Sequence, residues 1–255
     1  MNTHFPFDIY PPMVSVLTEA YDNKFFKIRV LLEKDTTEDE SYEDLLKSMY
    51  WSCMKTEKIE EKGIEPLRDI LDSLGGWPML KGNSWEAASF DWIETLRRLR
   101  ELGYDHSILI GLQVTSNKIF GLPHTIMLDH ASLGIPRSSM LDLNHEERFL
   151  YYLWIFRTAQ EMDTKKQNLQ LENEIWDALN FETMLAEIST SNEDSVDHLY
   201  EPHTIKDLLS SEKEIDWLRL FNALLNEEVT ENERLFIKDK NFVTKFADLM
   251  KKTDK

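Results

Sequence analysis

Positions 145–149 come nearest to the pattern of a zinc-dependent hydrolase. Such a site needs two histidines four residues apart on one helix face, and a glutamate beside the first histidine to activate the metal-bound water. His145 and Glu146 fit the first two places, but Phe149 stands where the second histidine belongs. Because phenylalanine cannot bind zinc, we interpret this stretch as the polar start of a helix.

The remaining histidines show no metal-ligand spacing either. They are His4, His106, His124, His130, His198 and His203, and no two lie three or four residues apart. His198 and His203 flank a short segment that could bring them together in a loop. The default interpretation is that they are exposed loop residues and that His124 and His130 lie at the surface, so no metal site is predicted.

Cys53 is the only cysteine, so the chain cannot form an internal disulfide. Two interpretations stay open: an ordinary buried thiol, or one half of a disulfide whose partner lies outside this chain. Its apolar helical neighbours do not favour a low-pKa nucleophile.

Acidic residues from Asp39 to Asp44 suit a helix start, and no glycine-rich phosphate loop or nucleophile elbow occurs. We therefore assign no catalytic, metal-binding or substrate-binding residue.

The elements that would position any site are mostly helical. Apolar residues recur at helical spacing in most of the chain. We expect helices over 14–34, 45–62, 65–74, 91–102, 144–162, 169–189, 205–209, 215–225 and 242–250. Proline can begin the 65–74 helix at Pro66, and Gly75 and Gly76 can end it. The 91–102 helix carries the apolar stripe Trp92, Leu96 and Leu99, and Gly103 is expected to cap its end.

The other segments complete the predicted fold. Apolar and β-branched runs at 107–114 and 125–128 predict a small β-hairpin, and 235–237 predicts a short extended piece. Residues 1–13 form an extended lead-in because of Pro6, Pro11 and Pro12, and a flexible polar loop is expected near 189–197. The fold class is therefore mainly α, a helical region over 14–255 with one small β-hairpin.

Charge and composition exclude several classes of partner. The 255 residues carry a formal net charge of −18, which opposes binding to nucleic-acid phosphates and to anionic lipid. No run of apolar residues is long enough for a transmembrane helix, and the first residues lack the charged and apolar regions of a signal peptide. We expect no nucleic-acid partner and no membrane segment in this chain.

The order of several motifs resembles the N-terminal region of the neprilysin-like zinc metallopeptidases, the family of neprilysin and endothelin-converting enzyme. The opening part of the resemblance reads Tyr-x-Ser-Cys-Met, Gly-Ile-x-Pro-Leu and Gly-Gly-Trp-Pro within 50–78. Later parts are the hairpin runs Leu109–Leu112 and Ile126–Asp129, the turn Ser132–Pro136, the helix Phe181–Ala186 and the segment Ile205–Leu218. Together these motifs run in order from about Val14 to the end of the chain.

The resemblance implies a peptidase that acts on small peptides with zinc supplied by its other half. That half bears His-Glu-x-x-His, a further glutamate ligand and a transition-state histidine, none of which this chain contains. The chain alone is thus expected to be non-catalytic and to bind no cofactor. Its expected partners are the missing catalytic domain of the same polypeptide and, in the complete enzyme, peptide substrates.

The resemblance also gives Cys53 a role. It matches a family cysteine that normally pairs with one far downstream, which would lie beyond Lys255. The family implies a cell-surface, single-pass or secreted protein, although this chain shows no leader or anchor.

The helical portion is expected to face the catalytic domain and to restrict access to small peptides. The alternative is a stand-alone, non-enzymatic binding or regulatory protein derived from the helical lobe, with an acidic surface that biases its partners.

Overall fold

The computed structural model describes residues 16–34, 42–117, 122–162, 168–189, 202–225 and 227–253. Its contacts divide the chain into two units, residues 1–63 and 64–255, which are described separately below. The predicted lead-in 1–13 and, apart from Ser189, the predicted loop near 189–197 lie outside the described residues. Those two assignments and the assignment of 14–255 to one helical domain therefore stay predictions.

The first unit consists of three helices, α1 (Val16–Glu33), α2 (Tyr42–Met54) and α3 (Thr56–Lys62). The helix expected over 45–62 is interrupted at Lys55, whose ψ of 65° takes it out of the helical conformation. The Tyr50 hydroxyl donates to the Glu33 carboxylate over 2.9 Å and so links α2 to α1. No side chain described in these helices is buried, so this unit has no core of its own among its described residues.

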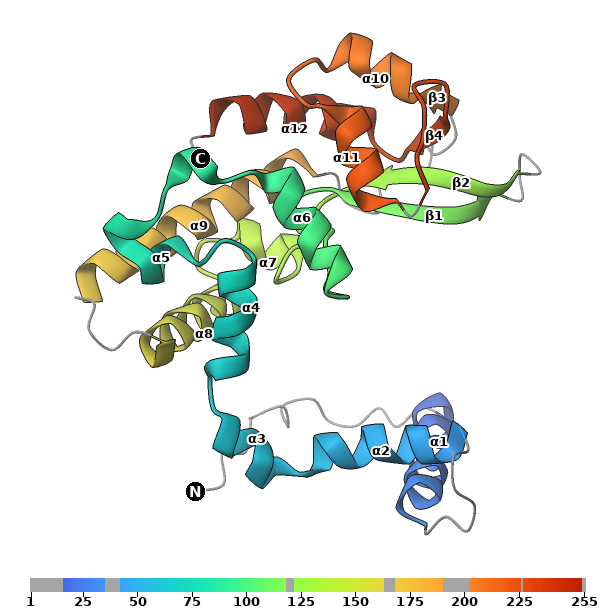
Figure 1. Cartoon of the computed structure of the whole chain (residues 1–255), viewed down its shortest axis with the longest axis vertical. Coiled ribbons are helices and arrows are strands. Elements are labelled where there is room, and N and C mark those ends of the chain that lie inside the picture. The colour runs from blue at the N-terminus through green and yellow to red at the C-terminus, as the bar shows by residue number, and fades with distance from the viewer. Residues whose placement is uncertain are drawn as a thin grey trace. The chain divides into compact units, whose positions relative to one another are not determined.

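The second unit contains the remaining elements (Figure 1). Its α-helices are α4 (Glu65–Ser73), α5 (Pro78–Lys81), α6 (Trp92–Glu101), α7 (Arg137–Leu141), α8 (Glu146–Met162), α9 (Asn168–Ile188), α10 (Ile205–Ser211), α11 (Trp217–Leu224) and α12 (Lys240–Lys252). Its strands are β1 (Gly111–Asn117), β2 (Leu122–Asp129), β3 (Pro202–Thr204) and β4 (Arg234–Ile237), and two 3₁₀ turns are η1 (Gly82–Ser84) and η2 (Ala87–Ser89).

Local sequence signals explain several helix ends. Gly75 and Gly76 follow α4 with φ of +103° and +87°, conformations that cost glycine little. Asp91 caps α6 by accepting from the amides of the next turn. Thr204 and Asp207 form a reciprocal capping box at the start of α10. The glycine end of α4 was expected from the sequence, and the prediction of a mainly helical fold is confirmed.

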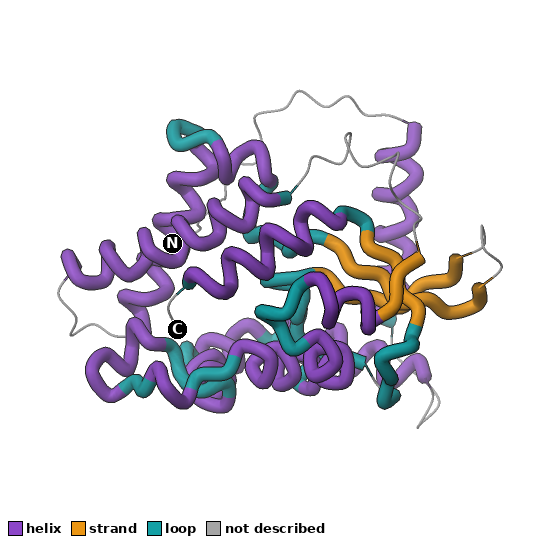
Figure 2. The backbone as a smooth tube through the Cα atoms, turned by 90° about the horizontal axis from the view of Figure 1, so that it is seen from above, coloured by secondary structure: helices purple, strands orange, loops and turns teal. Residues whose placement is uncertain are grey.

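The predicted hairpin is confirmed as β1 and β2, which pair antiparallel with Val114 opposite Ile126. Regular pairing begins at Gly111 rather than at 107, since the Asp105 carboxylate accepts from the Ser107 amide in a local turn. The hairpin is part of a four-stranded sheet in the order β1-β2-β4-β3, gathered in one place in Figure 2. β4 runs parallel to β2, a pairing that the sequence did not indicate.

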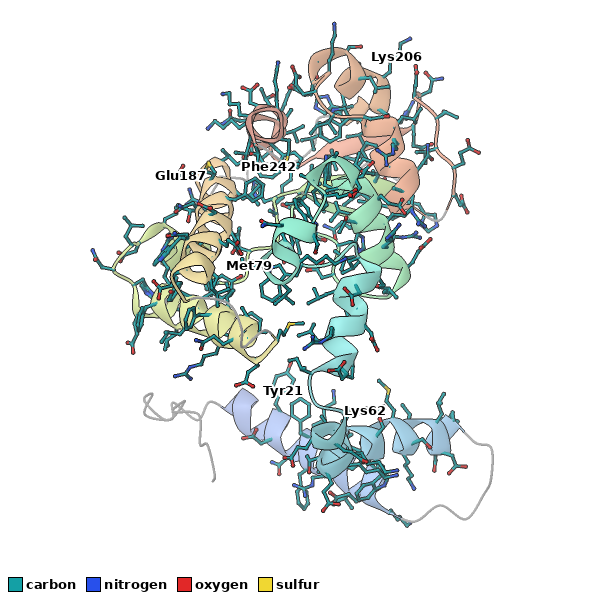
Figure 3. All side chains as sticks on the ribbon, turned by 60° about the vertical axis from the view of Figure 1, so that its left-hand side comes forward. Tyr21, Lys62, Met79, Glu187, Lys206 and Phe242 are labelled. Carbon is teal, nitrogen blue, oxygen red and sulfur yellow. The ribbon has the colours of Figure 1, made fainter. Side chains whose placement is uncertain are left out.

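Two apolar clusters stabilise the second unit. The larger one joins the sheet to α6, α10, α11 and α12 and surrounds fully buried side chains such as Trp217, Phe221 and Phe246. The smaller one joins α5, α8 and α9 around Met79 and Ile175. Figure 3 labels one residue of each cluster, Met79 and Phe242. Because both clusters are closed by residues of 64–255, this unit has a core independent of residues 1–63.

Candidate functional site

Four ionisable groups from distant parts of the chain lie together, Asp129, His130, Lys238 and Asp239, which we name the His130 cluster. The His130 ring contacts the Asp239 carboxylate over 3.2 Å through Nε2 and the Asp129 carboxylate over 3.4 Å through Nδ1. Lys238 Nζ lies 2.9 Å from the other oxygen of Asp129. The His130 side chain is only 11% exposed, which shields these charges partly from water.

The sheet brings these residues together from distant parts of the chain. β2 and β4 pair in parallel with Leu128 opposite Ile237, so Asp129 and Lys238 leave the sheet side by side. Asp239 then caps α12 by accepting from the Phe242 amide over 3.1 Å. The ring of Phe242 meets His130 edge-on, with centroids 4.9 Å apart. His130 was expected at the surface, and that expectation is wrong because α12 packs over it.

Chemically, the His130 cluster is a carboxylate–imidazole–carboxylate arrangement that can position a charge. It joins the end of β2 to the start of α12. It does not form a metal centre, because in the described part of the chain no three His, Cys, Asp or Glu side chains are placed to hold a metal ion. Its ordered hydrogen bonds favour a structural or charge-positioning function.

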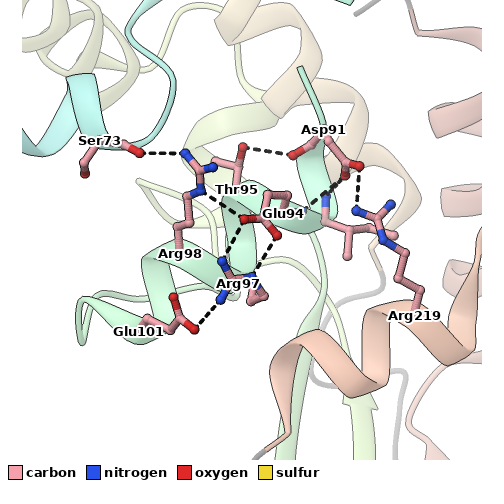
Figure 4. Close-up of polar contacts among 9 residues, drawn as sticks. Ser73, Asp91, Glu94, Thr95, Arg97, Arg98, Glu101 and Arg219 are labelled. Atoms are coloured by element: carbon pink, nitrogen blue, oxygen red, sulfur yellow. Dashed lines mark hydrogen bonds and ion pairs between the residues drawn. The ribbon is translucent and has the colours of Figure 1, made fainter. Parts of the chain in front are cut away.

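A second charged network lies on α6, where Arg97, Arg98 and Arg100 form a basic cluster in the sequence (Figure 4). Glu94 pairs with Arg97 over 2.7 Å and with Arg98 over 3.0 Å, and these hydrogen bonds lower the pKa of Glu94 to about 2. Arg98 also donates to the Ser73 carbonyl over 2.8 Å and so ties α6 to the end of α4. The basic cluster is therefore internally neutralised rather than open to an anionic partner.

Asp91, the cap of α6, extends this network to α11 through a 2.6 Å contact with Arg219. Burial raises the pKa of Asp91, but the Arg219 guanidinium and the α6 amides outweigh burial and keep it below its ordinary value. The carboxylate thus stabilises the helix start and joins two helices at once. It has the properties of a structural aspartate.

The stretch 145–149 has no metal-binding geometry. His145 precedes α8, where its Nδ1 accepts from the Glu147 amide over 3.3 Å, and Phe149 is exposed. Arg148 is only 4% exposed and donates to the Met140 carbonyl at the end of α7 and to Thr183 Oγ1 over 3.1 Å. Sequence reasoning missed this buried arginine, since nothing local distinguishes it from a solvated one.

The other predicted residues are not gathered into a site. Cys53 is a free, exposed thiol on α2, so the buried-thiol interpretation is wrong, while the disulfide stays untested. His203 lies in β3, His124 is exposed, and His198 falls outside the described residues. Glu43 and Asp44 occupy the first turn of α2, as expected.

Among the described helices, none has the length and apolar character needed to cross a membrane.

Comparison with curated proteins gives relatives along nearly the whole chain. It is 28% identical to Neprilysin-1 of Trittame loki over 84% of its length and 29% identical to Neprilysin-2 of Drosophila melanogaster over 94%. It is 26% identical to Endothelin-converting enzyme 1 of Bos taurus over 89%. The chain spans only 30–31% of the length of these relatives.

Solved structures show the same fold. The open state of Mycobacterium tuberculosis zinc metalloprotease Zmp1 matches 92% of this chain with a TM-score of 0.72 at 17% identity, and the match covers 36% of that protein. Its inhibitor complex gives a TM-score of 0.68. The sequence profile of peptidase family M13, in its N-terminal part, matches residues 11–255. The chain therefore belongs to peptidase family M13 and corresponds to the N-terminal region of its members.

Proposed function

We propose that this chain is the non-catalytic N-terminal portion of a neprilysin-like zinc metalloendopeptidase, and that the complete protein hydrolyses small peptides. The remaining portion would supply zinc and the groups that act on the peptide bond. The residues present here do not fit zinc: the nearest motif ends in Phe149, and the described residues offer no cluster of three metal-binding side chains. No step of peptide hydrolysis is therefore assigned to them.

The observation that carries the proposal is the apolar surface that each unit leaves open. In residues 1–63, large exposed apolar side chains include Phe25 and Phe26 of α1 and Leu45 and Trp51 of α2. Soluble monomers rarely expose contiguous apolar surface on this scale unless a partner covers it. The partner that fits the family assignment is the missing catalytic domain, which we expect to pack on helices of this chain.

The second unit has an open apolar stripe as well, although its own core is complete. Phe149, Leu150 and Trp154 follow one face of α8, and Trp154 is 65% exposed. The stripe is not a defect of folding, because α8 buries Ala159 and Met162 on its opposite face. A helix with apolar residues on two faces is typical of one packed between two bodies. We expect this face, too, to be covered in the complete enzyme.

Cys53 remains a proposed disulfide half. Its exposure on α2 makes the thiol accessible to a cysteine of the remaining portion. The proposed localisation follows the family, at the cell surface or secreted, where such a disulfide would persist.

A quenched-peptide assay tests the assignment. This chain is expected to give no turnover with or without added zinc and to retain no stoichiometric zinc after gel filtration, while a complete family member such as Neprilysin-2 serves as the positive control. Zinc-dependent cleavage by the 255-residue chain, abolished by a chelator, would overturn the proposal.

One observation favours the alternative, a stand-alone binding or regulatory protein: residues 64–255 close two cores of their own. The two functions predict different behaviour in solution. A selected binding module should be monodisperse, melt in one transition and bind little hydrophobic dye. A portion that needs its catalytic domain should bind the dye strongly and associate through its open faces.

A further inference from the structure

The segment between β2 and α7 forms the wall of an open groove made of two adjoining cavities. One, of about 290 Å³, is lined by the His130 cluster residues Asp129, His130 and Lys238 together with Ser189. The other, of about 420 Å³, runs along the turn at Gly134, Ile135 and Pro136. The two cavities share Ala131, Leu133 and Arg137. The groove therefore has a charged end, an apolar end and an arginine between them.

The acids at the charged end are already matched. Asp129 accepts from Lys238 Nζ over 2.9 Å and from the His130 amide over 2.7 Å. Asp239, which lies behind His130, accepts from His130 and from the Phe242 amide. Lys238 is thus committed to Asp129, and neither carboxylate is left to neutralise a further cation.

Arg137 differs from Lys238 in having no carboxylate partner in the part of the chain that the structure describes. Its Nε donates to the Ala186 carbonyl in the last turn of α9 over 2.8 Å. This bond orients the half-buried guanidinium and leaves its two terminal nitrogens free of that contact, in a residue that lines both cavities. An oriented, unneutralised guanidinium stands out in a chain with a net charge of −18.

We propose that this groove binds the carboxylate of a peptide segment, with an apolar side chain beside the carboxylate. The two terminal nitrogens of Arg137 match the two oxygens of a carboxylate in a planar, bidentate pair. Leu133 and Ile135, both half-buried, provide the apolar wall. Asp129 and Lys238 line the same cavity but offset each other, so Arg137 is left to balance the single charge of a carboxylate rather than the double charge of a phosphate.

The proposal does not rest on the proposed function, since it concerns binding by this chain without hydrolysis. Failure of one therefore leaves the other standing. Two sources of the carboxylate share this chemistry, an acidic side chain and a peptide C-terminus. Matched peptides distinguish them: acetyl-Ala-Leu-Glu-amide against acetyl-Ala-Leu-Gln-amide, and acetyl-Ala-Leu-Ala with a free carboxyl against its amide.

The test is a titration of the ¹⁵N-labelled 255-residue chain followed by amide chemical shifts. We expect saturable shifts at Leu133 and Arg137 with a carboxylate peptide, and binding at least tenfold weaker with its neutral counterpart. Arg137→Gln should weaken binding at least tenfold as well, about 1.4 kcal/mol. Lys238→Gln should change it only two- to threefold, and Arg157→Gln, at an exposed arginine of α8, should leave it unchanged.

Loss of the Ala186 contact could unfold Arg137→Gln, so Arg137→Lys is a second variant. It keeps the positive charge but not the planar guanidinium, and its peptide affinity is expected to fall three- to tenfold. The peptide pairs need no variant at all. The proposal is overturned if a neutral peptide binds as tightly as its carboxylate partner, if the shifts fall away from the groove, or if no peptide binds at millimolar concentration.

Discussion

Replacement of Gly134 by alanine tests the packing of the turn that forms the groove. A Cβ at this position would lie 2.2 Å from the Tyr151 hydroxyl and 2.5 Å from the ring carbon that bears it. Gly134 is not among the described glycines with positive φ, so its backbone tolerates alanine. Any loss of stability must therefore come from the contact with Tyr151 rather than from backbone strain.

The expected loss in the free energy of unfolding depends on the contacts around Tyr151 that the new methyl group would disturb. Burial and the neighbouring Glu182 carboxylate raise the pKa of Tyr151, and the same Glu182 accepts from the Gly134 amide over 2.6 Å. Overpacking costs about 1–3 kcal/mol, and disturbing a hydrogen bond to a charged group adds about 1 kcal/mol. The reduced freedom of the unfolded chain returns about 0.5 kcal/mol, which leaves a net loss of about 1.5–3.5 kcal/mol.

For a unit of this size, that loss lowers the melting temperature by about 3–14 °C, measurable by circular dichroism at equal protein concentration. Tyr151→Val serves as the matched background, because it removes the ring that the new methyl group would meet. In that background the alanine should cost under about 0.5 kcal/mol. Our reasoning fails if Gly134→Ala melts within a degree of the original chain, or if the tyrosine replacement does not suppress its effect.

Four further outcomes are expected. Asp91→Ala should lower the free energy of unfolding by about 1 kcal/mol through the lost α6 cap, while Asp91→Asn should retain most of it, as urea midpoints will show. The pKa of Glu94 is lowered in the folded chain, so its stabilising contribution is present above pH 4.5 and is lost as the pH falls toward 2; Glu94→Gln should flatten acid unfolding curves over that range. Arg148→Met should cost about 2 kcal/mol in urea unfolding because a buried carbonyl loses its donor. The Cys53 thiol should react completely with Ellman's reagent in the folded chain, and slow or partial reaction would contradict its exposure.

Signals confined to a few neighbouring residues predicted the structure well. Asp91 and Gly103 mark the two ends of α6, and Gly75 with Gly76 marks the end of α4, because capping depends on side chains within one turn. The hairpin was predictable for the same reason, since its two strands adjoin. The family resemblance added the order of these elements and is confirmed by the M13 match.

What could not be predicted depends on pairing over long distances. The parallel contact between β2 and β4 brings Lys238 to Asp129 across 109 positions, and no local pattern encodes that register. His130 was therefore misplaced at the surface. Arg148 was misread for a related reason: its burial is set by the carbonyl end of α7 and by Thr183 of α9, neither of which its sequence neighbours reveal.

In the proposed complete enzyme, the two units would depend on the remaining portion to different degrees. Residues 64–255 close their own cores, so a partner covering α8 would add to a unit that is already folded. Helices α1–α3 bury no described side chain, and isolated helices of their length are marginal in water without tertiary packing. Their stability should therefore depend on a partner far more than that of the second unit. Cys53 lies on α2, within this dependent part, where the proposed covalent link to the remaining portion of a complete enzyme would contribute most.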